Sequence, residues 1–270
     1  MPHAWDPDRY LAYADERGRP FVELLARVGA TGEAAPRRVV DLGCGPGNLT
    51  RLLAERWPRA AVVGVDSSEP MIAKARASVP DLAFEVADLR DWARGVEPGS
   101  VDVLVSNATL QWVPGHLELL PTLVRAVPAG GWFAFQVPGN FGEPSHTIRE
   151  ELAAEEPYAA HTRGLARPAS HDPVVYLESL RAAGCEVDAW ETTYLHVLTG
   201  EDAVFDWISG TSLRPTAAAL PAELWPRFAE ELRRRLAVAY PAYGGRVVLP
   251  FRRIFCVARV VPAAGGGEGV

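Results

Sequence analysis

Apolar residues in the first half of the chain fall into five short runs, at residues 39–42, 61–66, 82–86, 101–105 and 132–137. Stretches with the spacing of amphipathic helices separate these runs. Short apolar runs that alternate with helical patterns are typical of buried parallel strands joined by helices. The pattern therefore predicts a doubly wound α/β sheet.

The second half of the chain has a different pattern. Residues 184–197 alternate apolar and polar positions, as a half-exposed strand does, and residues 246–259 read as another strand. Pro250 predicts that this last strand has an edge or a bulge. Residues 202–209 and 222–240 have helical spacing. We expect the two strands to pair like a hairpin and complete the sheet, with the helices between them forming a cap.

These patterns divide the chain into four parts. Residues 1–30 are expected to form a leading helix that acts as a lid over a ligand cleft, and residues 31–145 to form the ligand-binding core. Residues 146–260 are expected to complete the sheet and to contain the cap, at about residues 200–245. Residues 261–270 are rich in glycine, and we expect them to be a disordered tail.

Composition and charge restrict the choice of partners. The 270 residues are 48% apolar and 23% charged, as in ordinary globular proteins, and the net charge of -7 without a long basic run argues against nucleic acid. Cys44, Cys185 and Cys256 are too far apart for a metal site, and their sparse, odd number is typical of a reducing compartment. Because neither a leader nor an 18-residue apolar run occurs, we expect a cytoplasmic protein without membrane contact. We expect the protein to be a monomer or a weak homo-oligomer.

A turn with three glycines follows the first apolar run. Gly43, Gly45 and Gly47 lie between Asp41 and Asn48, and a helical pattern comes next. Glycine tolerates positive φ and lets a ligand approach the backbone, and a helix N-terminus offers free N–H groups and a partial positive charge. We expect Asn48 to cap the helix. The sequence therefore predicts a nucleotide-type binding turn.

Two features separate this turn from the common nucleotide motifs. A dinucleotide-binding turn has glycine or alanine where Asn48 stands, and a P-loop ends in Lys followed by Ser or Thr, which the turn lacks. Asp41 would repel a phosphate but would attract a cation. The turn therefore favours a cationic ligand without phosphate.

Acidic and polar residues also follow the second apolar run. Asp66 lies about twenty residues after the glycine turn, where an acid accepts both ribose hydroxyls in a mononucleotide-binding half. A helix cap is its alternative role. Ser68 is expected to cap the next helix, with Pro70 in the first turn, and Met71 to contact an adenine or to belong to the core.

The motif Asp41-Leu42-Gly43-Cys44-Gly45-Pro46-Gly47 resembles motif I of the class I S-adenosylmethionine-dependent methyltransferases. The resemblance implies a Rossmann-like sheet of seven strands with helices on both faces, and S-adenosyl-L-methionine as the cofactor. In that family an acid after the third strand holds the adenine amino group, and the next backbone N–H meets a ring nitrogen; Asp88 and Leu89 match. The residues expected to bind or cover the cofactor are Asp41, Gly43, Gly45, Asn48, Asp66, Ser67, Met71, Asp88, Leu89, Asn107, Ala108, Tyr10 and Arg19.

The loop after the fourth run lies where the strand order of such a sheet reverses, at the carboxyl edge where ligands bind. Asn107 and Ala108 are expected to face the methionine part of the cofactor, and Gln111 and Trp112 to wall the methyl-transfer site. An anchor between helix and sheet is an equal alternative for Trp112. For the lid residues the alternative is a solvated helix face.

Blocks spread over residues 5–259 resemble the bacterial trans-aconitate 2-methyltransferase family more closely. The most specific blocks are Thr192-Thr193-Tyr194, Asp206-Trp207, Leu213-Arg214-Pro215 and Arg253-Ile254-Phe255. The chain departs from the family pattern at Gly139 and in its tail. The resemblance implies transfer of a methyl group to a carboxylate of trans-aconitate, with a monomethyl ester and S-adenosylhomocysteine as products.

A polycarboxylate acceptor needs cationic donors, and arginine grips carboxylates bidentately. Strand alternation sends Arg252 and Arg253 to opposite faces, so we expect one of them, Arg253, in the site. The residues expected to bind the acceptor are Arg214, Arg253, Trp112, Tyr194, Trp207, Gln111 and His171, each with a structural role as the alternative.

The chemistry needs no catalytic base, because a carboxylic acid with a pKa near ~4 is already ionised at neutral pH. No metal is expected. Three alternatives stay open at this point. They are a methyltransferase for another small or carrier-bound carboxylic acid, a binding module that kept the cofactor fold, and a nicotinamide-dependent oxidoreductase.

Overall fold

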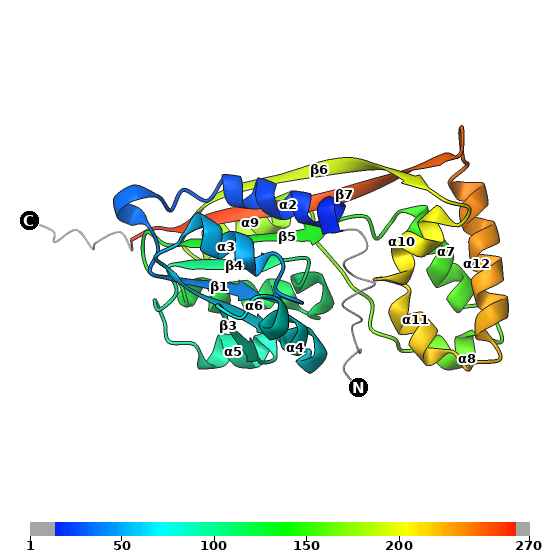
Figure 1. The fold of residues 1–270 in the computed structure, drawn as a ribbon, viewed down its shortest axis with the longest axis horizontal. Coiled ribbons are helices and arrows are strands. Elements are labelled where there is room, and N and C mark those ends of the chain that lie inside the picture. The colour runs from blue at the N-terminus through cyan, green and yellow to red at the C-terminus, as the bar shows by residue number, and fades with distance from the viewer. Residues whose placement is uncertain (1–13, 263–270) are drawn as a thin grey trace, which may run out of the picture.

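The structure, a computed structural model, describes residues 14–262 and centres on a seven-stranded sheet of order β3-β2-β1-β4-β5-β7-β6 (Figure 1). Its first five strands pair in parallel, and β7 runs antiparallel between β5 and β6. The strands are β1 (Arg38–Leu42), β2 (Ala61–Asp66), β3 (Ala83–Val86), β4 (Val103–Asn107), β5 (Trp132–Pro138), β6 (Cys185–Thr199) and β7 (Arg246–Val260). The predicted fold class is confirmed.

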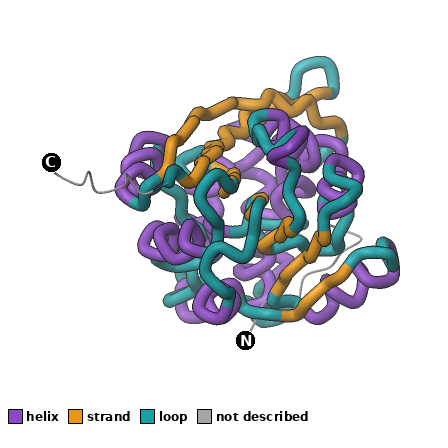
Figure 2. The backbone as a smooth tube through the Cα atoms, turned by 90° about the vertical axis from the view of Figure 1, so that its left-hand side faces the viewer, coloured by secondary structure: helices purple, strands orange, loops and turns teal. Residues whose placement is uncertain are grey.

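Helices cover both faces of the sheet (Figure 2). One face packs on α2 (Ala14–Ala26) and α3 (Thr50–Arg56), and the other on α5 (Leu89–Gly95), α6 (His116–Arg125) and α9 (Pro173–Ala182). The short turns η1 (Gly32–Ala34) and η2 (Leu110–Trp112), and α4 (Glu69–Ser78), complete this half. The central strands β1, β4 and β5 are buried on both faces, which explains why their apolar runs lack alternation, whereas the edge strand β3 is largely exposed.

Two sequence predictions on local structure are confirmed in this half and its hairpin. Ser68 caps α4, because its hydroxyl accepts a hydrogen bond from the N–H of Met71 at 3.4 Å, and Pro70 lies in the first turn. β5 pairs with residues 253–259 of β7, so Pro250 lies beyond that pairing and stands opposite Leu195 of β6. Pro250 therefore occupies a free edge of β7, where its missing N–H breaks no ladder.

A helical cap stands at one end of the sheet (Figure 1). Its helices are α7 (Pro144–Ala153), α8 (Ala159–Thr162), α10 (Ala203–Ser209), α11 (Arg214–Ala219) and α12 (Trp225–Ala239), so it recruits residues 144–162 as well as the predicted insertion. A separate hydrophobic cluster joins α7, α10 and α12, and it includes Phe228, Leu232 and Leu236 of α12. The cap is therefore a second core beside that of the sheet.

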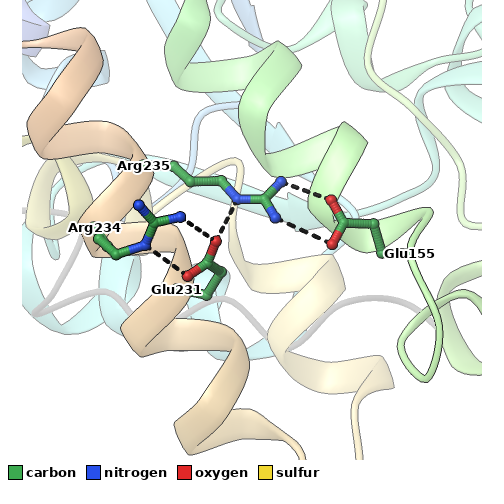
Figure 3. A network of polar contacts seen from close by, with 4 residues as sticks. All are labelled: Glu155, Glu231, Arg234 and Arg235. Carbon is green, nitrogen blue, oxygen red and sulfur yellow. Dashed lines mark hydrogen bonds and ion pairs between the residues drawn. The ribbon is translucent and has the colours of Figure 1, made fainter.

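Charged side chains also tie α12 to the end of α7 (Figure 3). The guanidinium of Arg235 donates to both carboxylate oxygens of Glu155, at 2.7 and 3.1 Å, and to Glu231 at 2.7 Å. Arg234 donates to the same Glu231 at 2.8 and 2.7 Å. These arginines lower the pKa of Glu231 to about 2. Because the network is exposed, solvent screens it, and it orients the two helices more than it stabilises them.

The leading segment packs on the sheet where it is described. Phe21 and Leu24 of α2 are fully buried in the cluster that also contains Val39 and Phe255. The expected lid role of Tyr10 falls outside the described residues. Within residues 14–262, no helix has the length and apolar character needed to cross a bilayer.

We predict that Phe228→Ala destabilises the protein by about 3–5 kcal/mol, because the fully buried ring leaves a cavity in the core of the cap. Val238→Ala on the same helix is the matched control, since that side chain is 76% exposed, and its effect is expected to stay within about 0.5 kcal/mol. Urea denaturation followed by circular dichroism measures both. Equal effects of the two substitutions would contradict a separate packed cap.

Candidate functional site

The sheet order reverses between β1 and β4, and two cavities lie at the carboxyl ends of the strands there. We call them the glycine-turn cavity and the cap cavity. The glycine-turn cavity is lined by Leu42, Gly43, Gly45, Pro46, Val65, Asp66, Ser67, Met71, Ala87, Asp88, Leu89, Asn107, Ala108, Thr109, Trp112 and Val113.

Positive φ angles shape the glycine turn. Gly43 has φ +80°, and its N–H donates to the carbonyl of Val65 at 2.7 Å, which holds the turn against β2. A Cβ on Gly43 would lie 2.0 Å from Oγ1 of Thr109, whereas a Cβ on Gly45 would meet nothing within 4 Å. Only glycine therefore fits at position 43, and the open side at Gly45 lets a ligand approach the backbone.

Asp66 links the turn to the start of α4. Its Oδ2 accepts from the N–H of Gly45 at 3.0 Å, and its Oδ1 accepts from the N–H of Ser68 at 2.9 Å. Burial raises the pKa of this carboxyl, and the two N–H donors oppose that shift. A carboxylate has about four acceptor positions, so the cavity side of Asp66 can still accept two hydroxyl groups.

Asp88 stands across the cavity, at the cap of α5. Its Oδ1 accepts from the N–H of Arg90 at 2.8 Å and of Asp91 at 3.4 Å, which fixes the carboxylate at the cavity wall. Leu89 follows it on the same wall, and Met71 is 3% exposed beside them. Met71 therefore belongs to the core and to the lining at once.

Asp41 and Asn48 do not line the cavity among the described residues. Asp41 is fully buried and accepts from Oγ1 of Thr50 at 2.7 Å. Burial, with a smaller contribution from the nearby Asp66, raises its pKa to about 7, although the hydrogen bond from Thr50 opposes the rise. The prediction that Asn48 caps the helix is wrong, because the turn runs on to Leu49, which takes the cap position without a side-chain hydrogen bond. Thr50 is the first residue of α3, and from this position its hydroxyl reaches the carboxylate of Asp41.

The cap cavity lies between the sheet and the cap, and it shares a wall with the glycine-turn cavity. Asn107, Ala108 and Trp112 line both cavities. The whole lining is Asn107, Ala108, Gln111, Trp112, Pro138, Asn140, Phe141, His146, Pro168, Trp207, Ile208, Thr211, Ser212, Phe251 and Arg253. A ligand in one cavity is therefore a neighbour of a ligand in the other.

The shared wall is held in a strained backbone conformation. Ala108 has φ +53°, which is rare for a residue with a Cβ. Its N–H donates to the carbonyl of Gln136 at 2.9 Å, and the side chain of Gln136 donates to Oδ1 of Asn107 at 2.8 Å. Strain of this kind persists where surrounding contacts enforce it, and it gathers at functional sites.

Arg253 is the cation of the cap cavity. It is 5% exposed, and it donates to Oε1 of Gln136 at 3.5 Å while its guanidinium lies 4.3 Å from the ring centroid of Phe251. Its neighbour Arg252 points the other way and pairs with Glu191 and Asp172. The predicted opposition of the two arginines is thus found, with Arg253 on the cavity side.

Four more polar atoms of the cavity lining are buried and have no hydrogen-bond partner within the part of the chain that the structure describes. They are Oε1 of Gln111, Oδ1 of Asn140, Nδ1 of His146 and Oγ of Ser212. Buried polar atoms are rarely left unpaired in folded proteins, because each costs about 1–3 kcal/mol. Their concentration around one cavity indicates a site for a polar ligand.

His146, Asn140 and Ser212 were absent from the sequence prediction. Burial and, to a smaller extent, the neighbouring Arg149 lower the pKa of His146 to about 3, so the ring is neutral at physiological pH. A neutral imidazole carries one donor and one acceptor nitrogen. No spacing in the sequence marks these residues, because they come together only when the folded cap and the ends of β4 and β5 enclose one cavity.

The structure does not bring Tyr194, His171 and Arg214 to the described lining of the cap cavity. Tyr194 donates to Oε2 of Glu23 on α2 at 2.6 Å, and Arg19 lies 5.0 Å above its ring. The N–H of His171 donates to the hydroxyl of Tyr176 at 3.1 Å beside α6. Arg214 begins α11. Acceptor binding by these three, and cofactor binding by Arg19, stay predictions.

The reversed sheet order, the glycine turn with its acid on β2, and a second cavity sharing a wall with the first define a class I methyltransferase. A family model described as a methyltransferase domain matches residues 39–131. Two solved structures have the same fold with TM-scores of 0.54. One is a phosphoethanolamine N-methyltransferase of Haemonchus contortus with S-adenosyl-L-methionine bound, 17% identical over 90% of this chain and 52% of its own. The other is a cyclase, 16% identical over 96% of this chain and 87% of its own. At this identity the likeness concerns the fold alone.

Closer relatives identify the family. A trans-aconitate 2-methyltransferase of Streptomyces avermitilis is 49% identical over 269 residues, which cover 96% of this chain and 98% of the relative. One of Rhodococcus jostii is 52% identical over 260 residues, which cover 95% and 99%. The chain belongs to the trans-aconitate 2-methyltransferase family. It is a methyltransferase, and S-adenosyl-L-methionine is its cofactor.

The glycine-turn cavity fits that cofactor. The backbone at Gly45 is open to direct contact by a ligand, and Asp66 offers two acceptor positions for the vicinal hydroxyls of the ribose.

We predict that Asp66→Ala weakens binding of S-adenosylhomocysteine at least tenfold, because hydrogen bonds to a charged group contribute about 1.5–3 kcal/mol. Asp81→Ala, at an exposed acid after α4, is the control. Isothermal titration calorimetry measures both, and unchanged affinity of the Asp66 variant would place the ribose elsewhere.

The buried Asp41 predicts a dependence of stability on pH. Its pKa is about 7 in the folded protein against 3.8 for an ordinary aspartate, so the folded state holds a proton that the unfolded state has released. The free energy of unfolding therefore falls as the pH rises from about 4 to about 7, by an amount on the order of 4 kcal/mol. Asp41→Asn should reduce this fall, and Asp81→Asn should not. Urea denaturation at pH 4.5 and pH 8 tests this, and the same pH dependence in wild type and Asp41→Asn would refute it.

Proposed function

We propose that this protein transfers the methyl group of S-adenosyl-L-methionine to a carboxylate of trans-aconitate, giving a monomethyl ester and S-adenosylhomocysteine. The observation that carries the proposal is the cap cavity, in which Arg253 and four polar atoms without a hydrogen-bond partner in residues 14–262 adjoin the glycine-turn cavity across Ala108. The relatives of about 50% identity that are named trans-aconitate 2-methyltransferases support the choice of acid.

The polar groups of the cap cavity suit a polycarboxylate. The guanidinium of Arg253, the hydroxyl of Ser212 and the ring of His146 can all donate to carboxylate oxygens. Rotation of the amide of Asn140 exchanges oxygen for NH₂ and adds a further donor. The amide of Gln111 keeps its orientation, because its Nε2 donates to the carbonyl of Ala108 at 2.6 Å. We infer that Arg253 offsets the charge of a carboxylate that does not react, since a buried unpaired charge is strongly destabilising.

The cofactor supplies an electrophilic methyl group on a sulfonium when it is bound. The acceptor carboxylate is already ionised at neutral pH, so the protein needs no general base. Its residues act by holding the two ligands in place and by excluding water. Trp112 and Ala108 separate the two ligands, Arg253 and Ser212 orient the acid, and Trp207, Phe251 and Phe141 exclude water. The absence of a required base is part of the proposal.

The remaining expectations are proposals as well. We infer that Asn107 faces the methionine part of the cofactor and that residues 1–30 act as a lid. We further propose that the protein works in the cytoplasm on a free small acid as a monomer or weak homo-oligomer, without nucleic acid. A methyltransferase for another small or carrier-bound carboxylic acid is the second candidate, because the polar cavity would also bind the carboxylate of such a substrate.

The direct test measures methyl transfer from labelled S-adenosyl-L-methionine to trans-aconitate, cis-aconitate, citrate, isocitrate and a fatty acid. We expect the highest kcat/KM with trans-aconitate. Preference for a different acid would keep the chemistry and exclude the proposed substrate. Cofactor binding without transfer to any acid, including a carrier-bound one, would favour a binding module.

We predict that Arg253→Gln lowers kcat/KM for the acceptor about 10-fold to 100-fold, chiefly through KM, because it removes a charged hydrogen bond of about 1.5–3 kcal/mol. Binding of S-adenosylhomocysteine should be unchanged, since Arg253 does not line the glycine-turn cavity. Arg252→Gln is a matched control one residue away, on the opposite face of β7. If both variants had the same KM for the acceptor, Arg253 would not bind the acid.

A further inference from the structure

A third cavity lies in the cap, on the far side of Pro168 from the cap cavity. It is lined by α7, α8, the segment 163–168 and the start of α11. Pro168 is the one residue common to the described linings of this cavity and the cap cavity. Neither the acceptor site nor the cofactor site uses it, and we call it the α7–α8 cavity.

The charged residues of this cavity are three arginines and one glutamate. Arg149, Arg163 and Arg167 line it together with Glu150, which leaves a net charge of +2. Arg163 and Arg167 are exposed at the rim, whereas Arg149 is 5% exposed. The protein as a whole has a net charge of -7, so this concentration of arginine is local.

Arg149 is a buried cation whose hydrogen bonds are incomplete. Its Nη1 donates to the carbonyl of Ser212, and its Nη2 donates to Oε1 of Glu150 at 2.8 Å. Its Nε–H has no acceptor among the residues that the structure describes. Glu150 also pairs with Arg167 at 2.9 Å, so one carboxylate is shared between two arginines. An additional anion would satisfy the Nε–H and balance the second charge.

The rest of the lining leaves room for such an anion. Ala153, Ala154, Ala159, Gly164 and Ala166 have small side chains, so the long arginine side chains surround a space and not a packed core. The hydroxyl of Thr162 already donates to the carbonyls of Ala153 and Tyr158. The guanidinium groups are therefore the charged donors of this cavity, and guanidinium groups match the geometry of oxyanions.

We propose that the α7–α8 cavity binds a small oxyanion with two negative charges, on Arg149, Arg163 and Arg167. A dicarboxylate and inorganic phosphate share this chemistry. The site is separate from the acceptor site but touches it, because Arg149 bonds to Ser212 and follows His146 by one turn of α7. The inference does not rest on methyl transfer, so its failure would leave the proposed function intact.

The test uses isothermal titration calorimetry on the full chain saturated with S-adenosylhomocysteine, at low ionic strength. Inorganic phosphate and succinate are titrated separately, which distinguishes the two sources of the anion. We expect at least one to bind with a Kd in the millimolar range or below. The double variant Arg163→Gln, Arg167→Gln should weaken this binding at least tenfold, and because both side chains are exposed it should fold normally.

Two controls decide where the anion binds. Arg227→Gln removes an exposed charge from α12, outside the cavity lining, and should leave the Kd unchanged. Arg253→Gln, in the acceptor site, should also leave it unchanged. The proposal is overturned if neither anion binds, if Arg227→Gln weakens binding as much as the double variant, or if Arg253→Gln abolishes it.

Discussion

The pairing of β6 with β7 is the interaction on which the rest of the structure depends. Over residues 253–259, β7 also pairs with β5 and belongs to the sheet, while its earlier residues pair with β6 alone and reach the cap. Arg253 is the residue at which β7 leaves β5, opposite Pro138. Strand β7 therefore contributes residues to the hydrophobic cores of both the sheet and the cap, and it places Arg253 where the two meet.

The cavities follow from this arrangement. The glycine-turn cavity needs only the parallel half of the sheet, because its glycine turn, Asp66 and Asp88 all come from the ends of β1, β2 and β3. The cap cavity needs both halves, since Asn107 and Gln111 come from the sheet side and Trp207 and Ser212 from the cap. Ala108, in a strained conformation, forms part of the wall that the two cavities share. Under the proposed function, acceptor selectivity is a property of the junction between sheet and cap, and cofactor binding is a property of the sheet.

The parts of this picture that follow from local chemistry could be predicted from the sequence. Continuous apolar runs indicated the parallel strands, the alternation in residues 184–197 indicated a further strand, and the cap at Ser68 followed from its side chain. The cap was wrongly predicted at Asn48 because a turn with three glycines can extend by one residue, to Leu49, without any change in composition. Asp41 was expected near a cationic ligand, yet burial and Thr50 hold its carboxylate away from the cavity.

The residues that line the cap cavity were harder to predict, because their positions depend on packing between distant parts of the chain. Arg253, Trp207, Gln111 and Trp112 do line the cap cavity, but His146 and Ser212 carry no motif and meet there only through the folded cap. Tyr194 lies on the expected strand, yet its hydroxyl is held by Glu23 of α2, a contact between residues 171 positions apart. Strand alternation predicts the face of a side chain, and it cannot predict which helix covers that face.

The central claim is that the two adjoining cavities bring a cofactor and a polycarboxylate together across the shared wall of Ala108 and Trp112. A crystal structure of the protein with S-adenosylhomocysteine and trans-aconitate tests this most directly. The account predicts ribose hydroxyls on Asp66 and a carboxylate of the acid on Arg253, with another carboxylate beside the shared wall and facing the sulfur. An acid bound away from Arg253, or a cofactor away from Asp66, would contradict it.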